Sequence, residues 1–128
     1  MLTNAIVQPT LPATDLDRAK KFYEEKLGFR PSAIHEDEGA LEYHCASGTG
    51  FIVYIRPDPP KAENTAAHFR VSDIEAEVKE LKGRGVVFEE YNYPQLKTVD
   101  SIATMGPTKG AWFKDSEGNI LGLTQTAK

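Results

Sequence analysis

Apolar and polar residues follow two different periods along this chain, and together the two periods predict helices set among strands. Residues 13–29 and 71–88 carry apolar side chains at helical spacing. The two apolar stripes are Leu16, Ala19, Tyr23 and Leu27, and Ile74, Val78 and Leu81. Each region opens with a Ser/Thr-x-x-Asp/Glu capping pattern, at Thr14 and at Ser72, and closes near glycine. We therefore predict two amphipathic helices.

Short extended segments surround each predicted helix and repeat in the same order. One strand-like segment precedes each helix, and three follow it. The segments are 5–11, 30–35, 40–45 and 51–56 in the first half, and 66–71, 86–91, 110–114 and 120–125 in the second. Aligning Asp15 with Asp73 gives an offset of 58 residues (73 − 15). The sequence therefore predicts an α+β fold made of two βαβββ modules.

The repeat also predicts how the chain is organised. A module of about 58 residues buries too little surface to be stable alone, so the two modules are expected to share one core in a single domain. Module 1 covers about residues 1–57, a proline-rich polar linker covers about 58–64, and module 2 covers about 65–128. Residues 91–109 lie outside the repeat, and a loop of that length is typical of a lid, a binding loop or a disordered segment.

Composition narrows the classes of partner. The formal net charge is −4, from 15 Lys and Arg against 19 Asp and Glu, with both signs mixed along the chain. Nucleic acid is not an expected partner, because phosphate binding needs a concentrated basic face. No apolar run reaches the ~18 residues that cross a membrane, and no signal-peptide pattern is present, so we expect no membrane partner and a cytoplasmic location. The single Cys45 excludes an internal disulfide, and we interpret it as a buried structural thiol.

Two motifs make the chain resemble the vicinal oxygen chelate superfamily. They are DLDRAKKFYEEKLGF at residues 15–29 and FKDSEGNILGL at residues 113–123, within a duplicated βαβββ order. The superfamily includes glyoxalase I, extradiol dioxygenases, fosfomycin-resistance enzymes and bleomycin-resistance proteins. The resemblance implies that each module curls its mixed sheet into a half-barrel and that the two half-barrels enclose a cavity. It implies little about activity, because this scaffold hosts unrelated chemistries.

The resemblance also implies where a metal ion would be held. In the metal enzymes of the superfamily, four ligands come from the first and last strands of each module, usually His or Gln with Glu, and His with Glu. The matching positions here are Gln8, Tyr54, Ala66 and Gly122. One amide and one neutral phenol cannot hold a divalent ion. We therefore expect the usual metal site to be absent and no cofactor to be bound.

The cavity positions are better suited to a small-molecule ligand. Alternation turns every second strand residue toward the cavity, where Ala66 and Gly122 leave room. The candidate ligand-binding residues are Gln8, Thr10, Tyr54, Arg56, His68, Arg70, Tyr91, Tyr93 and Gly122. Structural alternatives exist: the arginines as solvated strand ends, His68 as a core histidine, Tyr54 and Trp112 as packing residues, and the two loop tyrosines as anchors. We predict metal-independent binding of a small apolar or aromatic molecule between the modules, in a homodimer as the resemblance implies.

An enzyme on the same scaffold is the alternative. It would be a glyoxalase-like lyase, an isomerase or a dioxygenase, with an atypical metal set or with His68 as the catalytic general base. His44 is a further candidate for a cavity histidine. A histidine base needs a polar partner that holds its tautomer, and the sequence shows no carboxylate to orient His68. The acidic runs at 36–38 and 89–90 are interpreted as solvated turns.

Overall fold

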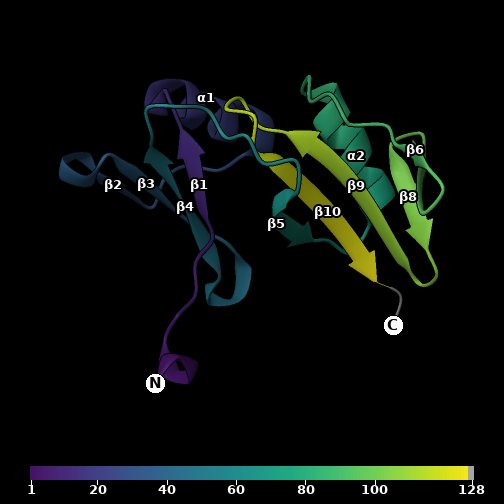
Figure 1. The fold of residues 1–128 in the computed structure, drawn as a ribbon, viewed down its shortest axis with the longest axis horizontal. Helices are drawn as coiled ribbons and strands as arrows, with labels where there is room; N and C mark the ends of the chain where they lie inside the picture. Colours follow the sequence, from purple (N-terminus) through teal and green to yellow (C-terminus); the bar gives the residue numbers. More distant parts are fainter. Residues whose placement is uncertain (127–128) are drawn as a thin grey trace.

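The computed structural model describes residues 1–126, and its strands form two separate mixed sheets (Figure 1). The first sheet has the order β1-β4-β3-β2 and contains β1 (Thr10–Ala13), β2 (Ala33–His35), β3 (Ala40–His44) and β4 (Gly50–Ile55). The second has the order β5-β10-β9-β8-β7-β6 and contains β5 (Thr65–Arg70), β6 (Asn92–Tyr93), β7 (Leu96–Val99), β8 (Ile102–Met105), β9 (Thr108–Lys114) and β10 (Ile120–Thr126). In each sheet the first strand pairs in parallel with the last, and the other pairs are antiparallel. The predicted α+β fold of mixed sheets is confirmed.

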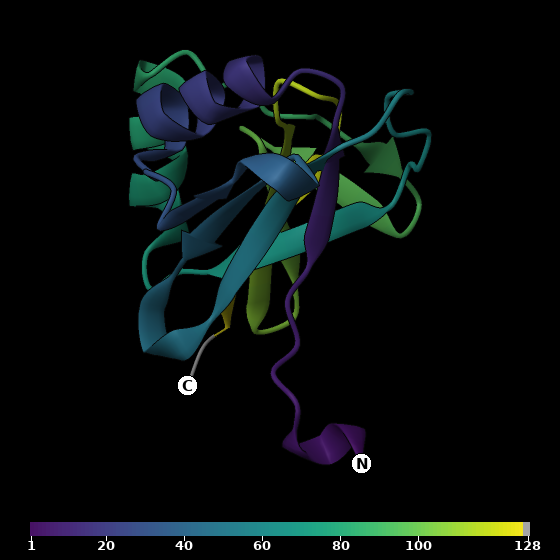
Figure 2. The same ribbon diagram turned by 90° about the vertical axis from the view of Figure 1, so that its left-hand side faces the viewer.

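Both helices lie on the same side of the molecule and cover one face of the sheets (Figure 2). α1 spans Leu16–Leu27 and α2 spans Ile74–Gly83. Their N-caps are Asp15 and Asp73, whose side chains accept from the amides three residues later at 3.0 and 3.1 Å. The sequence pattern predicted caps at Thr14 and Ser72, one residue before the observed ones. The following aspartates act as caps instead, because a carboxylate acceptor is favourable at the positive end of the helix dipole.

The core beneath the helices is aromatic and joins the two modules. Tyr43 stacks on Phe51, with ring centroids 4.8 Å apart, and Tyr23 of α1 packs against both. Phe69 of β5 stacks on Phe29 at 5.7 Å, so an aromatic side chain of the second sheet completes the cluster of the first. Aromatic pairs of this kind stabilise by about 0.5–1.5 kcal/mol beyond the area that they bury.

A five-residue turn, Asp115–Asn119, connects the second sheet to module 1. The buried Asp115 carboxylate accepts from the Tyr23 hydroxyl at 2.6 Å, and burial together with that carboxylate raises the pKa of Tyr23 well above its ordinary value. The Asn119 amide donates to the Pro12 carbonyl at 2.9 Å. Because Pro12 has no N–H, this contact leaves no free backbone group at that point of the β1 edge.

Glu117, in the same turn of module 2, accepts hydrogen bonds from backbone amides at the start of α1 in module 1. Its carboxylate accepts from the Thr14 and Asp15 amides and pairs with Arg18, with 2.7 Å between Arg18 Nε and Glu117 Oε2. The Asp15 amide, at the N-cap, is among those that an α-helix cannot satisfy internally. Burial alone would raise the pKa of Glu117, but the hydrogen bonds from Arg18, Ser116 and the Asp15 amide lower it to about 2.

The structure differs from the sequence prediction at the N-terminus. Residues 5–11 were expected to form the first strand, but β1 begins only at Thr10, and a short 3-10 helix (Leu2–Asn4) precedes it. The segment projects away from the body of the molecule in both views (Figures 1 and 2). Its apolar side chains are exposed, at 84% for Ile6 and 89% for Val7.

The stretch 91–109 also differs from the prediction, because it is a strand meander and not an irregular loop. It contains β6, β7, β8 and the start of β9, joined by tight turns. Residues 86–91 contribute only an isolated bridge between Phe88 and Phe113, and the strand equivalent to β2 is therefore β8. Two further 3-10 turns, Glu36–Glu38 and Ala46–Gly48, flank β3. Within residues 1–126 no helix has the length and apolar character needed to cross a membrane.

Acid unfolding tests the Glu117 contact. Since the folded pKa of Glu117 is depressed to about 2, its contribution to stability is present above the unfolded pKa of 4.5 and is lost as pH falls toward 2. We expect Glu117→Gln to lower the free energy of unfolding at pH 7 by about 3 kcal/mol and to flatten the pH dependence between about 4.5 and 2. Chemical denaturation across this range measures both. Glu80→Gln, which removes an exposed ion pair with Arg84, is the control and should change little; equal losses in the two variants would contradict the assignment.

Candidate functional site

The candidate site is the face of each sheet that points away from the helices, called here the open face. In the second sheet, His68 of β5 pairs with Gly122 of β10, which pairs with Trp112 of β9. In the first sheet, Thr10 pairs with Ile52 and Pro12 pairs with Tyr54. Directly paired residues share a face, and their chain neighbours, such as Leu11, Val53, Leu121 and Phe113, are buried in the core.

Three aromatic rings form a group on the open face of the second sheet, called here the aromatic shelf: Tyr91, Tyr93 and Trp112. The Tyr91 and Tyr93 rings are stacked, with centroids 5.9 Å apart and planes 26° apart. Tyr91 also meets Trp112 edge-on at 5.6 Å and 70°. Tyr93 is 60% exposed, and the other two rings are half-buried. Burial is the main reason that the pKa of Tyr91 is raised, which keeps it a neutral phenol.

Two glycines explain how the Trp112 indole lies against the sheet. A Cβ atom at Gly110 would be 2.9 Å from Trp112 Cη2, and one at Gly122 would be 3.4 Å from Trp112 Cδ1 and Nε1. These atoms lie at opposite ends of the indole, so the ring spans both glycines. Gly122 is also close to His68, at 3.3 Å between the Cβ positions. The sequence suggested open space beside Gly122. In the structure, Trp112 and His68 border that space.

His68 stands beside the aromatic shelf with its ring oriented. Its Nδ1 lies 3.0 Å from Thr124 Oγ1. When the hydroxyl donates to Nδ1, Nε2 carries the proton and is a hydrogen-bond donor toward the open face. His68 and Arg70 are both exposed and, two residues apart on β5, share the face. His68 is thus not a core histidine, and its partner is a hydroxyl and not a carboxylate.

The other candidate residues belong to module 1 and are more dispersed. Tyr54 of β4 is half-buried, and Thr10 of β1 is exposed. Gln8 and Arg56 lie just outside these two strands and are also exposed. The structure thus groups His68, Arg70, Gly122 and the two tyrosines at the second sheet. It places Thr10 and Tyr54 on the first sheet, with Gln8 and Arg56 next to its strands.

A histidine–carboxylate cluster that the sequence did not indicate lies on the first sheet. Glu42 of β3 contacts His35 Nε2 and His44 Nε2, each at 3.0 Å, through its two different oxygens. The hydrogen bond to Glu42 raises the pKa of His35, and the two histidines together lower the pKa of Glu42. His44 lies on the open face, opposite the buried Tyr43, whereas Cys45 packs against the core and burial raises its thiol pKa. This position agrees with the interpretation of Cys45 as a structural thiol.

The four positions that correspond to metal ligands in the resembled enzymes do not fit a metal ion. The side chains of Ala66 and Gly122 carry no donor atom, and the Trp112 indole is in van der Waals contact, at 3.4 Å, with the place of a Cβ atom at position 122. Gln8 lies outside β1. Within residues 1–126, no three His, Cys, Asp or Glu side chains are arranged to hold an ion.

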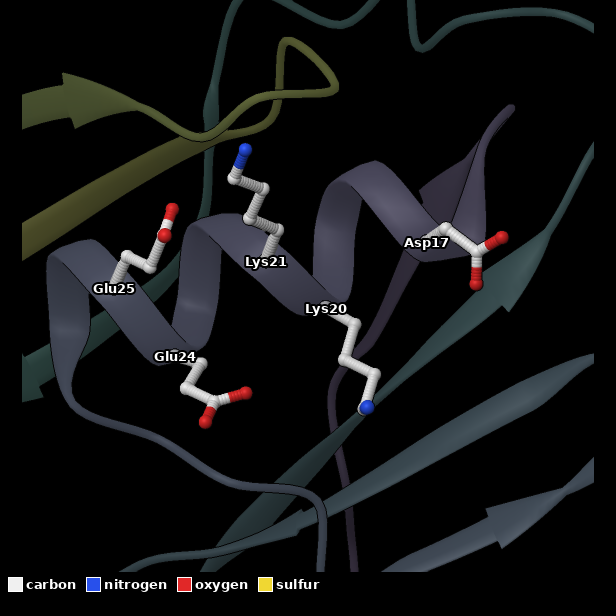
Figure 3. Close-up of a pocket in the computed structure, with 5 residues that line it drawn as sticks. All are labelled: Asp17, Lys20, Lys21, Glu24 and Glu25. Carbon is white, nitrogen blue, oxygen red and sulfur yellow. The ribbon is translucent and has the colours of Figure 1, made fainter.

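Two surface hollows are lined by residues other than those of the aromatic shelf. One is lined by Asp17, Lys20, Lys21, Glu24 and Glu25, and Figure 3 shows these side chains extending in different directions from α1 alone. The second lies beside β2, at residues 34–38. The first has walls from a single helix and charges of both signs, and the second is lined by three acidic side chains, so neither suits an apolar ligand.

The chain matches the sequence profile of the Glyoxalase/Bleomycin resistance protein/Dioxygenase superfamily over residues 5–123, and it belongs to that superfamily. A search of curated proteins gave no match. Among solved structures, a putative glyoxalase family protein from Bacillus anthracis superposes with a TM-score of 0.75 at 15% identity, covering 96% of this chain and 95% of that one. The fosfomycin resistance protein FosX from Listeria monocytogenes gives 0.68 at 16% identity, covering 98% and 91%. TnmS3, an antibiotic binding protein from Streptomyces sp. CB03234, gives 0.67 at 25% identity, covering 96% and 98%.

Substitution at Gly110 tests how the indole is seated. We expect Gly110→Ala to shift the emission of Trp112, the single tryptophan of the chain, because the new methyl group would lie within 2.9 Å of the ring. Overpacking of this kind destabilises by about 1–3 kcal/mol. Fluorescence and thermal unfolding measure the two effects. Gly83→Ala meets no atom within 4 Å and serves as the control; an unchanged emission spectrum in Gly110→Ala would show that the indole lies elsewhere.

Proposed function

We propose that this protein binds a small planar aromatic molecule on the open face of its sheets, without a metal ion or another cofactor, and that it acts in the cytoplasm. The aromatic shelf is the observation that carries this proposal. Half-buried and exposed rings that stack on one another offer a flat apolar surface for another ring. Among the solved structures, the one at 25% identity is an antibiotic binding protein, which supports a binding role for this scaffold.

The polar groups around the shelf would orient such a ligand. A pocket that is mostly apolar and has a few placed polar groups is the usual composition of a small-molecule site. When the Thr124 hydroxyl donates to His68 Nδ1, Nε2 of His68 is a donor on the open face, and Arg70 adds a positive charge on the same face. A planar aromatic molecule with an acidic or acceptor substituent matches this combination. From the first sheet, Gln8, Thr10, Tyr54 and Arg56 would contact the part of the ligand that extends from the shelf.

Catalysis is the less supported alternative on this scaffold. General-base action by His68 requires a partner that stabilises the protonated ring, and the Thr124 hydroxyl does not provide a negative charge. The histidines that do contact a carboxylate, His35 and His44, lie on the other sheet. We therefore favour binding over turnover.

Titration with anthraquinone-2-sulfonate tests the binding role. This probe is planar, aromatic and anionic, and we expect it to quench Trp112 emission in a saturable manner, while cyclohexanesulfonate, an anion without a ring system for stacking, does not. Tyr91→Leu should weaken binding about tenfold, since one aromatic contact is worth about 1.5 kcal/mol. His68→Ala should weaken it similarly while thermal stability stays nearly unchanged, and His35→Ala serves as the matched histidine control.

Two results of this titration would contradict the proposal. One is the absence of saturable quenching by the aromatic probe. The other is an affinity that falls after dialysis against EDTA and returns on addition of Zn²⁺ or Ni²⁺, because that would place a metal ion in the site.

We also propose that the protein is a homodimer, in which the exposed faces of one copy cover those of the other. The exposed apolar side chains of the N-terminal segment support this, because Leu2, Ile6 and Val7 are each more than 80% exposed in the single chain. Light scattering is expected to give twice the chain mass of 14.2 kDa. A mass equal to that of one chain would refute the dimer and leave the binding role to be tested separately.

A further inference from the structure

Glu90 directly precedes Tyr91 and is bonded to the hairpin formed by β7 and β8. Its Oε1 accepts from Thr98 Oγ1 at 2.5 Å and from the Ser101 amide at 3.1 Å, and its Oε2 accepts from Ser101 Oγ at 3.2 Å. The hydrogen bond from Thr98 is the main reason that the pKa of Glu90 lies below its ordinary value. The carboxylate therefore connects the segment that carries the aromatic shelf to a turn about ten residues further along.

The turn that Glu90 contacts has an unfavourable backbone conformation. Asp100 and Ser101 have φ angles of 52° and 76°, and they connect the paired residues Val99 and Ile102. Positive φ at both central residues is the requirement of a type I′ hairpin turn, which Asn-Gly satisfies best. A serine at the second position carries the steric cost of a Cβ atom there. The Glu90 carboxylate offsets this cost by holding both the amide and the hydroxyl of Ser101.

Thr98 transmits the position of the hairpin to Tyr91. Its hydroxyl donates to Glu90 and accepts from the Tyr91 amide at 2.8 Å, and its own amide donates to the Tyr91 carbonyl at 2.9 Å. The backbone of Tyr91 is thus held on both sides by one residue, whose hydroxyl is in turn oriented by Glu90. The Tyr91 ring then contacts both Tyr93 and Trp112.

We propose that Glu90 is the positioning residue of the aromatic shelf: by bonding to Thr98 and Ser101 it holds the strained β7–β8 turn, and through Thr98 it sets the place of the Tyr91 ring. This role rests on the proposed binding of aromatic molecules. Glu90 does not touch the ligand, and its effect on affinity is indirect. The adjacent Glu89 instead pairs with Lys114 of β9, at 3.6 Å between Nζ and Oε1.

The experiment compares Glu90→Gln with Glu89→Gln, both of which remove one charge from the same dipeptide. Glutamine replaces charge-assisted hydrogen bonds to Thr98 and the Ser101 amide with weaker neutral ones, and its NH2 group cannot accept from the Ser101 hydroxyl, which Oε2 of Glu90 does. We expect Glu90→Gln to change the near-ultraviolet circular dichroism and the Trp112 emission of the ligand-free protein, and to weaken anthraquinone-2-sulfonate binding about tenfold. Glu89→Gln should leave all three at the wild-type values.

A rescue variant separates positioning from a general loss of stability. Adding Asp100→Asn and Ser101→Gly to Glu90→Gln supplies a turn that adopts positive φ without a carboxylate. We expect these changes to restore both the ligand-free spectra and most of the affinity for the probe. Recovery of thermal stability without recovery of the spectra would overturn the proposal.

The controls distinguish this proposal from the proposed function itself. If the wild-type protein does not bind the probe, the binding role fails, while the ligand-free spectra of the same variants still decide whether Glu90 positions the rings. If Glu90→Gln resembles Glu89→Gln in spectra and affinity, the positioning role is overturned and the binding role stands.

Discussion

The hydrogen bond between the Tyr23 hydroxyl and the buried Asp115 carboxylate is the contact on which the arrangement of the two modules depends. It ties α1 to the turn that precedes β10, and the same turn delivers Glu117 to the start of α1 and Asn119 to the edge of β1. A short polar turn thus satisfies helix amides, a strand-edge carbonyl and a buried phenol together. Because the modules are joined on the helix side, the opposite faces of both sheets carry no structural role in that joint.

Because the modules are joined on the other side, the side chains of the open face differ in kind from those of the core. The core side is filled by tightly packed aromatic and aliphatic residues, whereas the open side carries histidines, arginines, threonines and partly exposed rings. Trp112 is the clearest case, since it belongs to a central strand and its neighbours Ala111 and Phe113 are fully buried. Side chains on this face can therefore differ without disturbing the packing that holds the modules together, which agrees with one scaffold supporting many functions.

The sequence predicted the parts of this fold that follow from local periodicity, and it missed those that depend on distant partners. Both helices and the mixed sheets could be inferred from apolar spacing and the internal repeat. The meander at 91–109 could not, because its tightest turn uses Asp100 and Ser101 in place of glycine and relies on Glu90 for support. Trp112 was interpreted as a packing residue, since its contact with Tyr91 and its position across two glycines require knowledge of strand register. The acidic pair at 89–90 was interpreted as a solvated turn for the same reason.

The position of the indole over Gly122 has a consequence for how such a sheet can change over evolutionary time. A carboxylate at position 122, where the metal enzymes of the resembled superfamily carry one, would begin only 3.4 Å from the Trp112 ring. A single replacement there would place the acid beside the indole without a second ligand from β5, because Ala66 has no donor atom in its side chain. The two uses of this sheet are therefore separated by at least two replacements, one at position 66 and one at position 122. An intermediate with only one of them would still lack the ligand set for an ion.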